Sequence, residues 1–422
     1  MSQVITTQQP ALLGGPQAVT IQAPSWPMAG EEEVSRMAEV VRSCRWSWVG
    51  PHEQAFCQDF AAFIGSKHCL CLANGTVTIE CALQAVGVLP GDEVIVPGLT
   101  WVATAQAAID IGANVVLVEI DPETWCIEPR AIEAAITPRT KAIIPVHLYG
   151  CMCDMDAIMD IARRHNLKVV EDVAHQHGSR WRDKGAGAIG DAGSFSFQQS
   201  KVLTSGEGGA ITCSDDEVYK TAHCLKHAGW TPDFEPGNRY GRNYRITEMQ
   251  CVLLRGGLSR LEEQTLTRDE NAQIIASELA RIGGPLRAAK RDPRVTRQAY
   301  YCQTFHFDPA GAGLTRSQYQ AALRAEGVDV LEPYPPVYRS KLMNLYDSTS
   351  PVVYRDPKTV QDYANLRLPN VERVVGETGL LLSHNSLLGD RGYIGQIISA
   401  VGKVNDNLAP IKKHFEAEEQ GR

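Results

Sequence analysis

The first strong pattern in the sequence is an alternation of short apolar runs with segments that have the spacing of amphipathic helices. The apolar runs cover residues 69–73, 93–97, 114–120, 142–146 and 168–173. The segments between them with helical spacing cover residues 76–86, 101–109, 129–136 and 155–165. Strands without polar alternation, separated by helices, are typical of a parallel sheet that is covered on both faces. The pattern therefore predicts an α/β domain.

The chain on either side of this alternation predicts two further parts. The first residues are rich in Gly, Pro and Gln and show no periodicity, and helical spacing begins at about Glu31. The composition changes near residues 283–285, and beyond them 300–307 alternates as a strand and 317–326 has helical spacing. We therefore predict an N-terminal arm, a large domain and a smaller C-terminal α+β domain, at residues 1–30, 31–285 and 286–422.

Composition narrows the class of protein. A chain of 422 residues with 44% hydrophobic content can bury the core of about two or three domains. The net charge of -8 comes without a basic block, which argues against a nucleic-acid partner. Residues 1–11 do not have the pattern of a signal peptide, and no apolar run has the length of a membrane span. We expect a cytoplasmic enzyme with no membrane partner.

The cysteines do not form a metal motif in the sequence. The chain has 12 of them, scattered and without a Cys-x-x-Cys pair, as expected of small buried side chains in a reducing compartment. The nearest approach to a ligand set is His147, Cys151 and Cys153, around a Tyr-Gly turn and without a fourth ligand. We expect no structural metal.

Chemistry in a parallel sheet is expected just after the carboxyl ends of the strands. After the first apolar run, Gly75 and Thr76 begin a helix whose free N–H groups suit a phosphate, although Asn-Gly-Thr is also a common turn and cap. After the second run, Trp101 could stack on a planar ligand, although a tryptophan of the core is the more frequent explanation. The fifth run ends in Glu171 and Asp172, and buried carboxylates are costly unless they have partners.

A lysine segment completes this set. Residues 196–209 place Lys201 between a serine-bearing aromatic run and a glycine cluster, a sheltered position for a nucleophilic amine. Taken alone, the segment fits two interpretations equally well: a sheltered nucleophilic lysine, or an ordinary strand and turn that carry a solvated lysine. Pyridoxal phosphate, however, needs a phosphate site, a stacking surface, a carboxylate for its ring nitrogen and a lysine for its aldehyde. No other common cofactor uses all four, so we predict pyridoxal phosphate.

The sequence resembles the DegT/StrS family of sugar and cyclitol aminotransferases, which have the aspartate-aminotransferase fold (fold type I of the enzymes that use this cofactor). The resemblance extends from about Ala11 to near the C-terminus. It rests on Asn74-Gly75-Thr76, on Asn243-Tyr244-Arg245 and on the stretches 97–101, 145–150, 171–178 and 196–209. It implies a large, mostly parallel α/β domain followed by a smaller one.

The resemblance also implies roles for individual residues. Lys201 would bind the cofactor covalently, and Asp172 would contact its pyridine nitrogen. Thr76 and Ser196 would bind its phosphate. Asn243 is similar to the family asparagine that reaches the phosphate of the neighbouring subunit, which implies a homodimer with shared active sites. The remaining position is His175, which lies where the family often has glutamine, near the phenolic oxygen.

Within the family, the sequence looks most like the L-glutamine-dependent aminotransferases that act on scyllo-inosose and 2-deoxy-scyllo-inosose in aminocyclitol antibiotic pathways. Stretches 197–204, with Gln198 and Gln199, and 296–301 support this similarity. It implies ping-pong transfer of the amino group of L-glutamine, or glutamate, to a cyclitol ketone. A nucleotide-sugar aminotransferase and a lyase like 3-amino-5-hydroxybenzoate synthase remain open alternatives.

Two other classes fit the sequence less well. The family's dehydratases replace the lysine with histidine, whereas Lys201 is a lysine. A non-enzymatic, cofactor-binding regulator could lose Lys201 or Asp172, and this chain has both.

Overall fold

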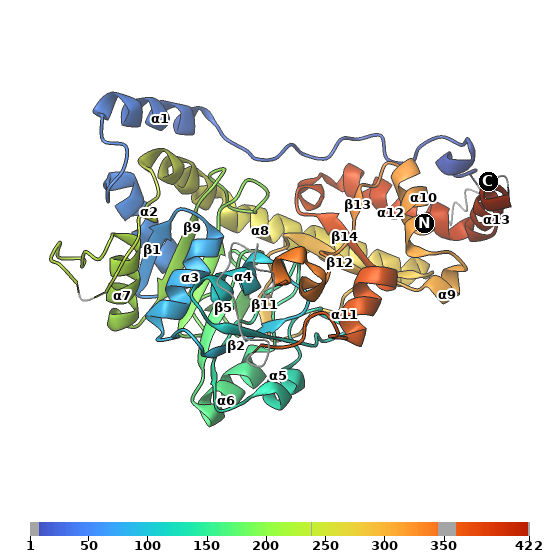
Figure 1. Cartoon of the computed structure of the whole chain (residues 1–422). Coiled ribbons are helices and arrows are strands. Elements are labelled where there is room, and N and C mark those ends of the chain that lie inside the picture. The colour runs from blue at the N-terminus through green and yellow to red at the C-terminus, as the bar shows by residue number, and fades with distance from the viewer. Residues whose placement is uncertain (1–7, 238, 345–359, 421–422) are drawn as a thin grey trace.

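A computed structural model describes residues 8–237, 239–344 and 360–420 (Figure 1). The chain packs around two apolar cores, one on the large sheet and one on a smaller sheet. The long helix α8 (Glu248–Ile282) contributes to both, with Leu254 and Leu261 in the first core and Ile275 and Leu279 in the second. This helix therefore connects the part that holds the large sheet to the part that holds the small one.

The large sheet has seven strands in the order β1-β9-β8-β5-β4-β2-β3. In that order they span His68–Leu72, Gly209–Cys213, Ala192–Ser196, Lys168–Asp172, Thr140–Ile143, Glu93–Pro97 and Asn114–Val118. Strands β8, β5, β4, β2 and β3 are parallel, and β9 runs antiparallel to both β8 and β1. The predicted mostly parallel α/β fold is confirmed, with one antiparallel strand inserted near its edge.

The helices between these strands lie where the apolar spacing predicts them. They are α3 (Gly75–Ala85), α4 (Ala103–Asp110), α5 (Pro129–Ala135) and α6 (Met155–His165). Strand β4 is shorter than predicted and ends at Ile143, because Pro145 has no N–H group for the sheet. The chain then rejoins the sheet through a single bridge between Val146 and Asp172.

The second core forms around a four-stranded antiparallel sheet in the order β10-β12-β14-β13. These strands span Leu286–Ala288, Cys302–Phe307, Gly379–Ser383 and Val330–Leu331. The predicted strand and helix of this part correspond to β12 and to α10 (Arg316–Ala325). The sequence did not predict β14, α12 (Arg391–Asp406) or α13 (Leu408–Gln420).

The other elements are short or lie outside the two main sheets. Helices α1, α2, α7, α9 and α11 span Glu31–Ser43, Pro51–Ile64, Asp216–Lys226, Pro309–Ala312 and Pro369–Arg373. A small sheet contains β11 (Val295–Arg297), β6 (Arg180–Trp181) and β7 (Lys184–Gly185). No helix among the described residues is long and apolar enough to cross a membrane.

The N-terminal arm packs on the second core of its own chain. The backbone N–H of Ala11 donates to Glu326 Oε1 (2.7 Å), and that of Val19 donates to the Glu326 carbonyl (2.9 Å). Val19 is buried in this core. Figure 1 shows the arm running along one side of the molecule, from this region to α1 at the opposite end. Helix α8 and the arm each extend from the part that holds the large sheet to the part that holds the small sheet (Figure 1). The domain limits at residues 30 and 285 therefore stay a prediction.

Candidate active site

A cavity of about 450 Å³ lies at the carboxyl ends of strands of the large sheet, where Tyr301 and Tyr334, from the chain that follows α8, also line it. Most of the residues predicted to bind the cofactor line it: Gly75, Thr76, Trp101, Asp172, His175, Ser196 and Lys201. Asn243 is the exception, since it is exposed and is not part of this lining. The structure thus brings seven of the eight predicted cofactor-binding residues together in one cavity, and it places the eighth, Asn243, on the surface.

The start of α3 forms one wall of the cavity. Asn74 caps the helix by accepting a hydrogen bond from the N–H of Val77 (3.0 Å). The N–H groups of Gly75 and Thr76 come before the first helical hydrogen bond, so they are free for an anion. A Cβ on Gly75 would lie 2.6 Å from the Cβ of Ser196. Only glycine therefore lets Ser196 of β8 approach this helix end.

Asp172 is the last residue of β5 and is buried. Its Oδ2 accepts a hydrogen bond from the Thr104 hydroxyl (2.8 Å), and its Oδ1 accepts one from the N–H of Ala174 (3.1 Å). Burial raises the pKa of Asp172, while these two bonds and the charge of Lys201 oppose that rise. The carboxyl group is thus held in one orientation at the edge of the cavity.

Lys201 follows β8 in a tight turn, in which its N–H donates to the Gln198 carbonyl (2.8 Å). Its Nζ lies 4.5 Å from the ring centre of Tyr301, and no hydrogen bond or ion pair joins it to another described residue. Burial lowers the pKa of Lys201 to about 8, although the charge of Asp172 opposes this. About a tenth of the amine is therefore neutral and nucleophilic at pH 7, far more than at the ordinary pKa of a lysine.

His175 forms an aromatic wall with two tyrosines. Its ring stacks on Tyr301, with centroids 4.0 Å apart. Its Nδ1 accepts a hydrogen bond from the N–H of Tyr149 (3.1 Å), and its Nε2 lies 3.4 Å from the Tyr334 hydroxyl. Burial holds the pKa of His175 well below its usual range. The ring is therefore neutral, with its proton on Nε2.

Glu171 does not line the cavity, and its carboxylate accepts hydrogen bonds from a histidine and from backbone N–H groups. His147 Nδ1 accepts a hydrogen bond from the N–H of Cys153 (3.1 Å), so its Nε2 donates to Glu171 Oε2 (3.0 Å). The Glu171 carboxylate also accepts the N–H groups of Gly187, Ile189 and Gly190. Neighbouring residues of a strand point to opposite faces, which sends Asp172 to the cavity and Glu171 into this loop. His147 and Cys153 are thus used in hydrogen bonding.

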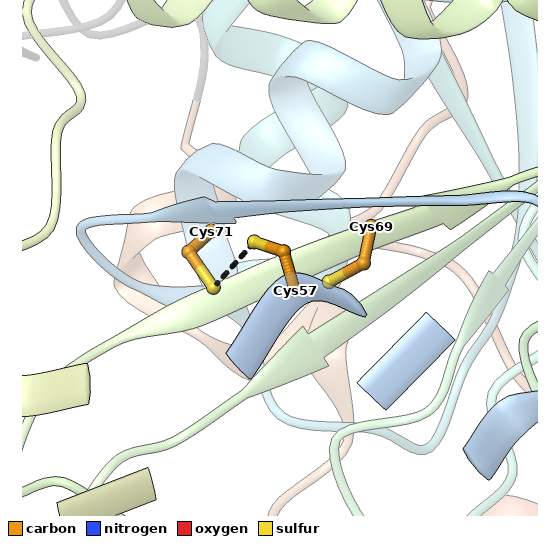
Figure 2. Close-up of side chains that lie close together, drawn as sticks. All are labelled: Cys57, Cys69 and Cys71. Atoms are coloured by element: carbon orange, nitrogen blue, oxygen red, sulfur yellow. Dashed lines mark hydrogen bonds between the residues drawn. The ribbon is translucent and has the colours of Figure 1, made fainter. Parts of the chain in front are cut away.

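The structure groups three cysteines that sequence spacing did not connect. Figure 2 shows Cys57 on α2 facing Cys69 and Cys71, which lie two residues apart on β1. Their sulfur atoms lie within 4.8 Å of one another, and those of Cys57 and Cys71 are 3.5 Å apart. Burial raises the pKa of the Cys69 and Cys71 thiols, which disfavours the thiolates that bind metals. We interpret the group as packing between α2 and β1.

Several residues of the site were missed as site residues from the sequence alone, among them Thr104, Tyr301 and Tyr334. Thr104 is the second residue of α4, three residues after Trp101, and its hydroxyl donates a hydrogen bond to Asp172. Tyr301 and Tyr334 line the cavity from the part of the chain that follows α8. Thr104 could have been found from its place after a strand end. Tyr301 lies in the stretch 296–301 that supports the subgroup, but only tertiary packing shows that it and Tyr334 reach the cavity.

Comparison with known proteins places the chain in a family. Residues 27–377 match the model of the DegT/DnrJ/EryC1/StrS aminotransferase family. The chain belongs to this family. It is an aminotransferase that uses pyridoxal phosphate, and the predicted family, fold type and cofactor are confirmed. The cavity suits this cofactor, because a glycine cradle, a buried carboxyl group and an unpaired lysine converge in it.

Individual relatives match along nearly the whole aminotransferase. A putative L-glutamine:3-amino-2,3-dideoxy-scyllo-inosose aminotransferase of Streptoalloteichus tenebrarius is 39% identical, over 96% of this chain and 100% of that one. The L-glutamine:2-deoxy-scyllo-inosose aminotransferase of the same organism is 38% identical, over 90% of this chain and 94% of that one. The crystal structure of 3-amino-5-hydroxybenzoic acid synthase is similar with a TM-score of 0.80 and 32% identity, covering 90% of this chain and 98% of that one.

Proposed function

We propose that this aminotransferase moves the amino group of L-glutamine to a ketone of a cyclitol such as 2-deoxy-scyllo-inosose or scyllo-inosose, in aminocyclitol biosynthesis. The observation that carries the proposal is the cavity lining, in which Lys201 and Asp172 are surrounded, besides the carboxyl group of Glu207, by neutral hydrogen-bonding side chains. These are Thr100, Ser194, Ser196, Gln198, Ser200, Tyr301 and Tyr334. Hydroxyl and amide groups suit a polyhydroxylated ring, and the named activities of the relatives point to the same substrates.

The residues of the cavity divide the work between binding and proton transfer. Gly75, Thr76 and Ser196 would hold the cofactor's phosphate, and Asp172 would hold its ring nitrogen. When bound, the cofactor supplies an electron-accepting ring that stabilises negative charge on the carbon next to the amine. Lys201 would anchor the cofactor, and its amine would be the base that takes the proton from the α-carbon of the amino acid.

The remaining side chains shape the pocket around that proton transfer. The aromatic walls of the pocket are Trp101, His175 and Tyr334. The rings of Trp101 and Tyr334 meet edge-on, with their centroids 5.3 Å apart. Of the two glutamines before the lysine, Gln198 lines the cavity, whereas the carbonyl of Gln199 accepts a hydrogen bond from Trp26. Gln198 is therefore the one placed to contact a substrate.

We further propose that the enzyme works as a cytoplasmic homodimer with shared active sites. Asn243 is exposed and lies outside the cavity of its own chain, as expected of a residue that serves a neighbour. Two residues after Asn243, the guanidinium carbon of Arg245 lies 4.6 Å from the ring centre of Trp48, which is also exposed. All 12 cysteines are free, which is typical of a reducing compartment.

The test is to follow the visible absorbance of the cofactor in the purified holoenzyme. L-Glutamine should abolish the absorbance of the lysine-bound form, and 2-deoxy-scyllo-inosose or scyllo-inosose should restore it while an aminocyclitol forms. The Lys201→Ala variant is the control that should show neither change. Recovery with a nucleotide keto-sugar but not with an inosose, or formation of an aromatic amino acid, would contradict the proposed substrate.

A further inference from the structure

Arg268 of α8 is a buried cation without a carboxylate partner among the described residues. The residue is 1% exposed, and among the described residues its side chain forms hydrogen bonds only with His384, from Nε to the carbonyl (3.3 Å) and from Nη2 to Nδ1 (3.5 Å). Its Nη1 has no partner in the described part of the chain. The adjacent Asp269 is paired with Arg291 at 2.6 Å. An unpaired buried charge is costly, which suggests a role beyond packing.

The guanidinium group lies against two aromatic rings. Its carbon is 5.4 Å from the ring centre of Trp26, and Trp26 meets the His384 ring edge-on at 4.7 Å. Since Arg268 faces Nδ1 of His384, that nitrogen is the acceptor and Nε2 carries the proton. Burial and the charge of Arg268 lower the pKa of His384 to about 3, so the ring stays in this neutral form.

Both rings reach the backbone directly before the lysine. The Trp26 Nε1–H donates to the carbonyl of Gln199 (3.2 Å), and the His384 Nε2–H donates to the carbonyl of Ser200 (3.0 Å). Trp26 belongs to the N-terminal arm, and His384 follows strand β14. Three distant parts of the chain therefore meet behind Lys201.

We propose that Arg268 is a positioning residue for Lys201. It fixes the ring of Trp26 and the tautomer of His384, whose N–H groups hold the carbonyls of Gln199 and Ser200 and so keep the amine directed into the cavity. This inference rests on the proposed role of Lys201. It makes the N-terminal arm part of the active site, although none of the arm residues that the structure describes lines the cavity.

The first test uses the cofactor-free protein, so that it does not depend on activity. Trp26→Phe, His384→Phe and Arg268→Met should raise backbone hydrogen exchange in residues 197–203 about tenfold. His384→Gln keeps an N–H donor and should restore most of the protection. Trp181→Phe and Arg316→Met are matched controls, because Trp181 and Arg316 are buried and bonded elsewhere, to Asp156 and Glu332.

The second test uses the holoenzyme and separates binding from turnover. The same three variants should lower kcat about tenfold while KM for L-glutamine changes by less than about twofold, since a misplaced amine slows proton transfer more than binding. Trp26→Phe removes only one N–H group, so it keeps the test valid if Arg268→Met fails to fold.

The outcomes distinguish this inference from the proposed function. Unchanged exchange in residues 197–203 in Trp26→Phe and His384→Phe would overturn the positioning role, even with an active enzyme. An equal effect of the Trp181 and Arg316 controls would overturn it as well, because the loss would then reflect general stability. Failure of the proposed function shows itself separately, as a wild-type holoenzyme whose chromophore does not respond to L-glutamine.

Discussion

Burial shifts the pKa values of Lys201 and Asp172, two ionisable groups of the cavity, in opposite directions. It lowers the pKa of Lys201 to about 8 and raises that of Asp172, so each charged form is disfavoured. Their mutual attraction partly offsets both shifts, which couples the two groups. The protonation state of the nucleophile thus depends on the carboxyl group that we propose as the partner of the ring nitrogen.

The coupling gives a pH prediction for the cofactor-free protein. Asp172→Asn removes a negative charge that raises the pKa of Lys201, so the lysine should lose its proton at a lower pH than the wild-type value of about 8. The measurement is the pH dependence of Lys201 acetylation, followed by mass spectrometry of its peptide, with the other lysines as internal references. A midpoint that stays the same or moves upward would show that the two groups do not interact.

At the scale of elements, the site depends on the close approach of the helix α3 and the strand β8. Gly75→Ala would place a methyl group 2.6 Å from the Cβ of Ser196, so one of the two elements has to move. We expect cofactor affinity to fall by at least about tenfold, because the phosphate contacts of the helix end are displaced. Cofactor titration of the apoprotein by absorbance measures this.

The matched control for this prediction is another helical glycine. Gly395 lies in α12, and a Cβ there would meet nothing within 4 Å. Gly395→Ala should therefore leave cofactor affinity unchanged and slightly favour the helix. Equal affinity of the Gly75→Ala and wild-type proteins would remove α3 from the phosphate site.

The elements also show how far the sequence is informative. The alternation of apolar runs and helical spacing predicts β1 to β5 and α3 to α6 because each signal is local. It misses α12, whose glycines at 392, 395 and 402 weaken the helical signal, and β14, whose short apolar run is ambiguous between strand and helix. The motifs at strand ends and around Lys201 identified most of the cavity lining, whereas Tyr301 and Tyr334 reach the cavity, and Trp26 the backbone before Lys201, through tertiary packing.

At the scale of the whole molecule, the exposed position of Asn243 is the feature that bears on assembly. If Asn243 serves the neighbouring site, a mixed dimer of Lys201→Ala and Asn243→Ala chains has one site with both defects and one with neither. Co-expressed chains carrying two different affinity tags should therefore yield hybrids with about half the wild-type activity, as expected of one intact site in two. Hybrids no more active than the Asn243→Ala homodimer would show that each chain completes its own site.

The central claim is that Lys201 carries the cofactor, and one measurement tests it directly. Borohydride reduces the bond between cofactor and lysine and makes it permanent, and tryptic digestion with mass spectrometry then locates the added mass. The account predicts the label in a single peptide, residues 185–220, uncleaved at Lys201. A label on another lysine, or an unlabelled peptide from a holoenzyme that still transaminates, would contradict it.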